Sequence, residues 1–181
     1  MKINNNIDNL EEKIRIVEAM PADAKDIIEY CKIIGSETDN LMYGEEGIHQ
    51  TVESEAKVLK EHMESDNRIF LVAKEGDRIV GTANFVGFTK ERIRHRGELG
   101  ITVLKSMWGR HIGTRLMEQI IEFAKKSAKS EIISLEVRSD NERAIALYKK
   151  FGFKKIGEYK GFFKINGENI DFDLMNLYLN K

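Results

Sequence analysis

Residues 108–117, WGRHIGTRLM, combine cations and glycines in a pattern that suits anion binding at the start of a helix. Acids are normally favoured in a first helical turn, because the free N–H groups make that end positive. Here Arg110, His111 and Arg115 stand there instead, and Gly109 would let an anion approach the backbone. The segment therefore indicates a polyphosphate site. The alternative is that the arginines face water and the glycine only forms a tight turn.

A second candidate pair lies in residues 140–153, DNERAIALYKKFGF. Asn141 and Tyr148 are seven residues apart, which is near two helical turns, so both lie on one face of a helix. Such a pair could address a ligand. The alternative roles are structural: Asn141 as the N-cap of the helix, and Tyr148 as part of an amphipathic core.

The periodicity predicts an α/β chain in which helices pack on a mixed sheet. Strand 98–106 directly precedes the first candidate segment, which is the context that a strand–helix anion site requires. The remaining elements are expected as a strand at 13–20, a helix from Pro21, a loop at 35–47, a helix at 51–65, a hairpin at 68–88, a helix after 108, a strand at 131–139, a helix at 140–153 and a hairpin at 154–179.

Composition limits the class of protein. The 181 residues include 41% hydrophobic side chains, which suits one domain, expected over residues 13–181 after a loose polar arm at 1–12. The net charge of -1 gives no general attraction to nucleic acid or to an anionic membrane. One cysteine permits no internal disulfide, and no apolar run suits a secretory signal or a membrane span. A cytoplasmic location is expected.

Two stretches taken together, ELGITVLKSMWGRHIGTRLM and LEVRSDNERAIALYKKFGF, resemble the GNAT superfamily of acyl-CoA-dependent N-acetyltransferases. The resemblance covers residues 13–179. It implies a central, mostly antiparallel, twisted sheet of about seven strands flanked by about four helices. It also implies a splayed pair of strands at the site of the cofactor.

The resemblance further implies that acetyl-CoA binds along strand 98–104, with backbone contacts from Ile101, Val103 and Lys105. The N–H of Val103 would polarise the thioester carbonyl. Asn141 matches a family residue that contacts the cofactor. The family loop that holds the pyrophosphate, together with the residue after it, corresponds here to Trp108, Gly109, Arg110, His111, Ile112, Gly113 and Thr114. Trp108 stands where the family has Gln or Arg, and His111 stands where it has Gly.

For catalysis, Tyr148 matches the tyrosine that commonly protonates the leaving thiolate. Direct attack requires a neutral amine, and Glu98 is the first candidate for the general base, with a plain surface carboxylate as the alternative. His95 is a weaker candidate. An acidic loop with Glu37, Asp39 and Tyr43 is expected to attract the cationic acceptor, unless it is merely a solvated loop. No metal site is implied.

The sequence thus predicts acetyl transfer to a primary amine, by direct attack in a ternary complex, with a small amine-bearing metabolite as the acceptor. The alternatives are a protein N-terminal amine as acceptor, or an acyl-CoA-binding sensor or assembly module without turnover. The intact Asn141 and Tyr148 favour an enzyme, whereas the altered pyrophosphate loop favours the sensor. A homodimer is a further expectation from the resemblance.

Overall fold

The computed structural model describes residues 14–179 and places seven strands in one sheet. The expected arm at residues 1–12 lies outside this range. Across the sheet the order is β1-β2-β3-β4-β5-β7-β6, and β4 and β5 are the one parallel pair among the described strands. The predicted mostly antiparallel sheet is confirmed. The strands are β1 (Ile14–Glu18), β2 (Arg68–Glu75), β3 (Arg78–Gly87), β4 (Arg96–Val103), β5 (Ile132–Arg138), β6 (Lys154–Ile165) and β7 (Glu168–Tyr178).

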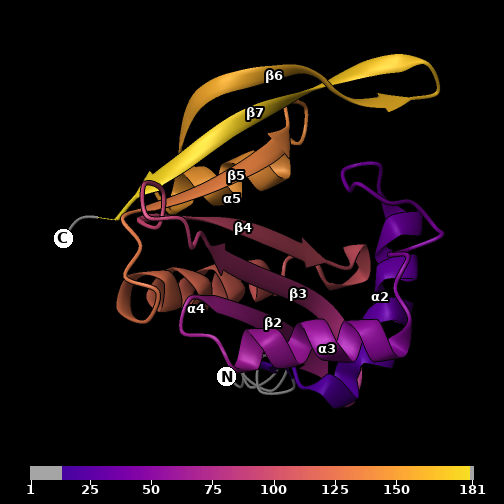
Figure 1. The fold of residues 1–181 in the computed structure, drawn as a ribbon. Helices are drawn as coiled ribbons and strands as arrows, with labels where there is room; N and C mark the ends of the chain where they lie inside the picture. Colours follow the sequence, from indigo (N-terminus) through magenta and orange to yellow (C-terminus); the bar gives the residue numbers. More distant parts are fainter. Residues whose placement is uncertain (1–13, 180–181) are drawn as a thin grey trace, which may run out of the picture.

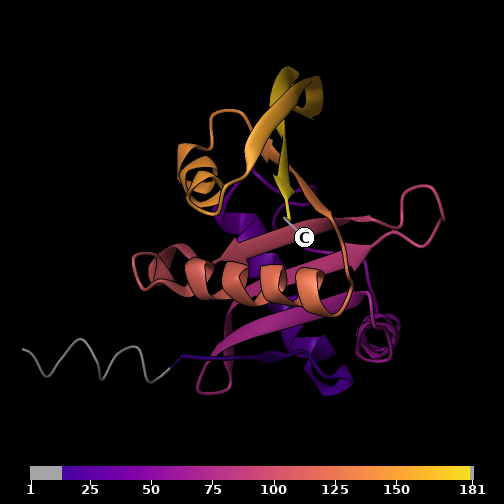
Figure 2. The same ribbon diagram turned by 90° about the vertical axis from the view of Figure 1, so that its left-hand side faces the viewer.

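Helices cover both faces of this sheet. Figure 2 shows α4 across one face of β2 to β4, with α2 behind the same strands. The predicted number of about four helices is confirmed within residues 14–179. They are α2 (Ala24–Glu37), α3 (Val52–Met63), α4 (Ile112–Lys126) and α5 (Glu142–Lys150), with single 3-10 turns η1 (Pro21–Asp23) and η2 (Lys105–Met107).

Helix α4 is fixed by its apolar face. Leu116, Met117 and Ile120 are fully buried, as their spacing of three and four residues predicts for one side of a helix. Complete burial of each such side chain stabilises the fold by about 1.5–3 kcal/mol. The first turn of α4 is thereby held against the end of β4, where Gly113 faces Val103.

Helix α2 is held against the opposite face by packing and by a polar contact. Ile27 and Ile34 are buried, and the Tyr30 hydroxyl lies 2.9 Å from the hydroxyl of Thr102 on β4. Burial raises the pKa of Tyr30, so this hydroxyl stays protonated and available for hydrogen bonding. The C-terminal end of α2 is consequently placed beside the end of β4.

The parallel pair opens into a fork. β4 and β5 pair only where Arg96–Glu98 faces Ile132–Ser134, and beyond that point the strands separate. The predicted splayed pair is therefore present, and it lies between the two halves of the sheet. The far half ends in the long twisted hairpin of β6 and β7, which extends beyond the other strands (Figure 1).

Some element boundaries differ from those predicted. Gly35 was expected to begin a loop, but α2 continues through it to Glu37. The missing side chain allows the carbonyl of Gly44, in the following loop, to pack directly on the helix backbone. Strand β4 ends at Val103 and α4 begins at Ile112, so the expected strand 98–106 ends earlier and the helix starts later than its pattern indicated.

In the described part of the chain, every helix is too short or too polar to cross a bilayer.

Candidate active site

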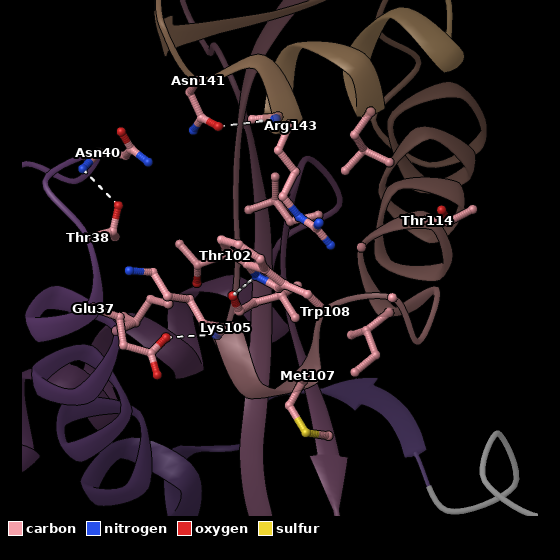
Figure 3. A pocket seen from close by; sticks show the side chains of 18 of the residues that line it. Glu37, Thr38, Asn40, Thr102, Lys105, Met107, Trp108, Thr114, Asn141 and Arg143 are labelled. Carbon is pink, nitrogen blue, oxygen red and sulfur yellow. Dashed lines mark hydrogen bonds between the residues drawn. The ribbon is translucent and has the colours of Figure 1, made fainter.

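A cleft of about 370 Å³ lies at the open end of the fork. Its walls come from β4, the first turn of α4, helix α5 and the C-terminal end of α2, so the segments are distant in sequence (Figure 3). The structure brings most of the predicted cofactor contacts into this one cleft. They are Ile101, Val103, Lys105, Trp108, Gly109, His111, Ile112, Gly113, Thr114, Asn141 and Tyr148.

The edge of β4 that faces the cleft carries peptide groups that do not pair with β3. The N–H of Leu104 donates to the carbonyl of Val80 on β3 at 3.1 Å. Because peptide groups in an antiparallel pair alternate between the two edges, Val103 directs its own N–H and carbonyl away from β3 and toward the fork. Ile101 shares this orientation by the same alternation. An extended ligand could add to this edge as a further strand.

The first turn of α4 forms a second set of donors. The N–H of Arg115 donates to the carbonyl of His111, which makes it the first amide of the turn with an acceptor among the described residues. The amides of Ile112, Gly113 and Thr114 precede it and point out of the helix end into the cleft. Three such donors, with the positive end of the helix dipole, suit a phosphate group.

His111 occupies a left-handed backbone conformation, with φ at 55°. This is the conformation that favours glycine, and it explains physically why the family loop has Gly there. A side chain in this region costs about 1–2 kcal/mol. The departure at His111 therefore acts on the backbone of the loop, and its exposed ring stands at the rim of the cleft.

Replacing His111 with glycine is expected to raise the free energy of unfolding by about 0.5–1 kcal/mol, because relief of strain exceeds the entropy lost by glycine. Urea denaturation would measure it. Ser106→Gly is the matched control, since Ser106 is an exposed residue of the same connection without a positive φ. The control should be destabilising, and a loss of stability in the His111 variant would show that the loop is not strained.

Two of the predicted cations are committed elsewhere. The Arg110 guanidinium pairs with Glu75 on β2 at 2.9 Å, and Arg110 is absent from the described lining of the cleft. Arg115 donates to the carbonyl of Ile14 on β1 at 3.1 Å. The cationic start of α4 therefore fastens the helix to the β1–β2 side of the sheet, and the α4 amides are left to face the cleft.

Arg143 is a cleft residue that the sequence reasoning missed. It extends from α5 toward Trp108, and its guanidinium carbon lies 4.2 Å from the centre of the indole ring (Figure 3). The indole N–H of Trp108 in turn donates to the carbonyl of Val103 at 3.0 Å. The signal available in the sequence was its position two residues after Asn141, at the start of the last helix.

Asn141 and Tyr148 take the predicted positions on α5. The side-chain oxygen of Asn141 accepts a hydrogen bond from the N–H of Ala144 at 3.2 Å, which is the capping role considered as its alternative. Tyr148 is 7% exposed, and both residues line the cleft. Burial raises the pKa of Tyr148 to about 12, so its hydroxyl is protonated at neutral pH and can donate a proton.

The three residues predicted to bind the acceptor are dispersed. A carboxylate oxygen of Glu37 accepts from the N–H of Lys105 at 2.8 Å, so this amide, predicted to contact the cofactor, already has a partner. Asp39 is exposed and lies at the outer rim between α2 and α5. Tyr43 is half-buried against the core and contacts Cys31, which places it away from the described cleft lining.

Glu98 is joined by a carboxylate that the sequence reasoning did not single out. Glu98 pairs in register with Ser134, and because side chains alternate along a strand, Glu136 lies on the same sheet face as Ser134. Glu136 is exposed to solvent on one side, and partial desolvation, followed by repulsion from Glu98, raises its pKa. The two carboxylates form an acidic pair at the base of the fork, on the face that carries α2, and both lie outside the lining of the cleft. In the sequence, Glu136 could have been noticed as the charged residue between Leu135 and Val137 in the predicted strand 131–139.

A group of aromatic rings borders the acidic pair. Phe172 on β7 is two residues from Leu174, which is paired with Glu136, so Phe172 and Glu136 share a sheet face. The hairpin aromatic cluster consists of Tyr159, Phe162, Phe163 and Phe172, with neighbouring ring centres 4.4 to 5.3 Å apart. No group of three metal-ligating side chains is found among residues 14–179.

The fold and cleft define a class of protein, and comparison with known proteins agrees with it. The family described as Acetyltransferase (GNAT) family matches residues 37–153. A GNAT acetyltransferase from Streptococcus pneumoniae has 32% identity and a TM-score of 0.88, over 92% of this chain and 99% of that one. The acetyltransferase yncA from Salmonella typhimurium, solved with its cofactor acetyl-CoA, has 19% identity and a TM-score of 0.80, over 93% and 95% of the two chains.

A curated relative, the N-alpha-acetyltransferase RimI of Mycobacterium tuberculosis, is 29% identical over 103 residues. That match spans 57% of this chain and 63% of the relative, which is less than two thirds of its length. The chain belongs to the GNAT acetyltransferase family. Members of this family use acetyl-CoA.

Proposed function

We propose that this enzyme transfers the acetyl group of acetyl-CoA directly to a primary amine in a ternary complex. The observation that carries the proposal is one cleft in which the open edge of β4, the free amides of α4 and the Tyr148 hydroxyl all meet. Acetyl-CoA supplies the activated acetyl thioester. The lone cysteine, Cys31, is buried in the core, which favours direct transfer over an acyl-enzyme.

Each group of residues in the cleft has a different proposed role in the reaction. The N–H of Val103, on the free edge of β4, donates to the reacting carbonyl oxygen, a contact that can contribute about 3 kcal/mol. The amides of Gly113 and Thr114 hold the pyrophosphate. Tyr148 gives its proton to the departing thiolate, and its raised pKa means that the hydroxyl is protonated at the working pH.

The acidic pair, Glu98 and Glu136, accepts the proton from the attacking amine. The raised pKa of Glu136 brings its carboxylate closer to the working pH, which improves a general base. Glu98 contributes by its charge, which repels the Glu136 carboxylate and attracts the ammonium form of the acceptor. The base is therefore proposed to be Glu136, assisted by Glu98.

We propose a small amine as the acceptor. The acidic pair attracts a cation, and Phe172 of the hairpin aromatic cluster is the diagonal neighbour of Glu136 on the adjacent strand, a spacing of about 7–8 Å. A compact amine with an apolar portion would contact both. A protein N-terminal amine is the second candidate, favoured by the similarity to the N-alpha-acetyltransferase RimI.

Release of free CoA thiol tests this function. The protein is mixed with acetyl-CoA and a panel of polyamines, aminoglycosides, amino acids and N-terminal peptides. Faster release with a small amine than with any peptide supports the proposal, whereas the reverse order supports the protein N-terminus. Tight binding of acetyl-CoA with no turnover across the panel would support the sensor instead.

The Glu136→Gln variant is expected to lose about 100-fold in kcat/KM at neutral pH, the usual effect of removing a general base. Glu98→Gln should lose less than about 10-fold. It should also lower the pKa of Glu136, because a repelling charge is gone, so activity persists to lower pH. Steady-state rates between pH 5 and 9 measure both effects. Glu118→Gln, on the exposed face of α4, is the control. A larger loss in the Glu98 variant would assign the base to Glu98.

The homodimer and the cytoplasmic location expected from the sequence stay predictions. Sedimentation velocity of the purified chain measures the first directly.

A further inference from the structure

Two side chains meet across the mouth of the cleft. Trp108 comes from the connection between β4 and α4, and Arg143 comes from α5 on the facing wall (Figure 3). The indole N–H donates to the Val103 carbonyl at 3.0 Å, and the guanidinium lies 4.2 Å from the ring centre. The contact therefore joins the free edge of β4 to α5.

The indole occupies the edge that the proposed function requires. Val103 directs its carbonyl into the fork, and this is where an extended thioester arm would add to β4. The Trp108 side chain is 45% exposed, so it can rotate outward without opening the core. For the arm to lie along Val103, the indole must leave this position.

Arg143 is the guanidinium best placed for a phosphate. Arg110 is paired with Glu75, and Arg115 donates to the Ile14 carbonyl. Among residues 14–179, by contrast, no carboxylate forms an ion pair with Arg143, whose described contact is the face of the Trp108 ring. A contact of this kind with an exposed ring contributes only about 0.5–1 kcal/mol, whereas a guanidinium matches a phosphate with two parallel hydrogen bonds.

We propose that the Trp108–Arg143 contact exists only while the cleft is empty and breaks when acetyl-CoA binds. Arg143 then binds a phosphate of the cofactor together with the α4 amides. This rests on the proposed function. The Trp108 indole leaves the Val103 carbonyl, and Arg143 exchanges the ring for the phosphate. Arg143 thus supplies, from α5, a guanidinium that faces the cleft, which the loop itself does not, because Trp108 replaces the Gln or Arg of the family pattern and Arg110 pairs with Glu75.

Fluorescence of the tryptophan can measure the first part of this proposal, the movement of the Trp108 indole. The chain has one tryptophan, so intrinsic fluorescence reports on Trp108 alone. Titration with acetyl-CoA should change the emission maximum or intensity in a saturable way, with the midpoint that calorimetry gives for binding. Binding in the calorimeter without a change in emission would overturn the proposal that the Trp108–Arg143 contact breaks.

Calorimetry tests the second part, the binding of a phosphate by Arg143, with one ligand that carries phosphates and one that carries none. Arg143→Gln should weaken acetyl-CoA binding about 10-fold, as expected for loss of a charge-assisted hydrogen bond. Its affinity for S-acetylpantetheine, which has no phosphate, should stay within about twofold of the wild-type value. Arg94→Gln is the control, because Arg94 is exposed and pairs with Glu91 on the loop before β4. The control should bind both ligands as the wild type does.

The outcomes separate this inference from the proposed function. If the wild-type protein does not bind acetyl-CoA, the proposed function fails, and this inference fails with it. If the wild type binds but Arg143→Gln binds acetyl-CoA equally well, or loses both ligands equally, the proposed function stands and the role of Arg143 is overturned.

Discussion

Replacing Tyr148 with phenylalanine is expected to lower kcat by about 100-fold, while the dissociation constant of acetyl-CoA stays within about twofold. The hydroxyl belongs to a residue that is only 7% exposed and that lines the wall of the cleft. The variant removes the proton donor and keeps the ring. Binding through the β4 edge and the α4 amides is therefore preserved.

The pH dependence of the rate is a second test of the role of Tyr148. Burial raises the pKa of Tyr148 to about 12, and an acid is active only below its pKa. Loss of the Tyr148 proton should consequently cause no fall in rate below about pH 11. Tyr178→Phe, at an exposed position at the end of β7, is the control and should keep full turnover. Unchanged turnover in Tyr148→Phe would remove this residue from the mechanism.

Replacing Gly35 with alanine is expected to destabilise the protein by about 3 kcal/mol. Alanine in a helix interior normally stabilises by about 1 kcal/mol relative to glycine. Here an added Cβ would lie far inside van der Waals contact with the carbonyl of Gly44, a backbone atom that cannot rotate away. Overpacking against backbone exceeds the gain in helix propensity, so the sign reverses.

Thermal denaturation should show a midpoint lowered by roughly 6–12 °C, for a chain of this size. Gly157→Ala is the matched control, since its Cβ would meet Leu174 at an ordinary 3.5 Å. It should change stability by less than about 1 kcal/mol. A neutral Gly35 variant would show that the 38–47 loop moves freely on α2. The Gly35 variant should also bind acetyl-CoA less well, because Thr38 and Leu41 of that loop line the cleft.

The sequence by itself determined the elements and the place of the site. The spacing of Leu116 and Ile120 predicts the buried face of α4, and the glycines and strand before it predict the junction where that helix begins. Asn141 and Tyr148 were placed on one face of α5 by helical periodicity alone. These features are local, because hydrogen bonding and side-chain period within a segment fix them.

The tertiary structure decided which partner each long side chain has. Arg110 was expected at the anion site, but Glu75 lies 35 residues away in sequence and pairs with it. Tyr43 was expected to meet the acceptor, but it packs against the core. Glu136 gains its raised pKa from partial desolvation and from Glu98 on another strand, and Arg143 meets Trp108 from a different helix. Such contacts depend on how strands are ordered and where β4 and β5 separate, and no local pattern encodes the distance between segments that are far apart in the chain.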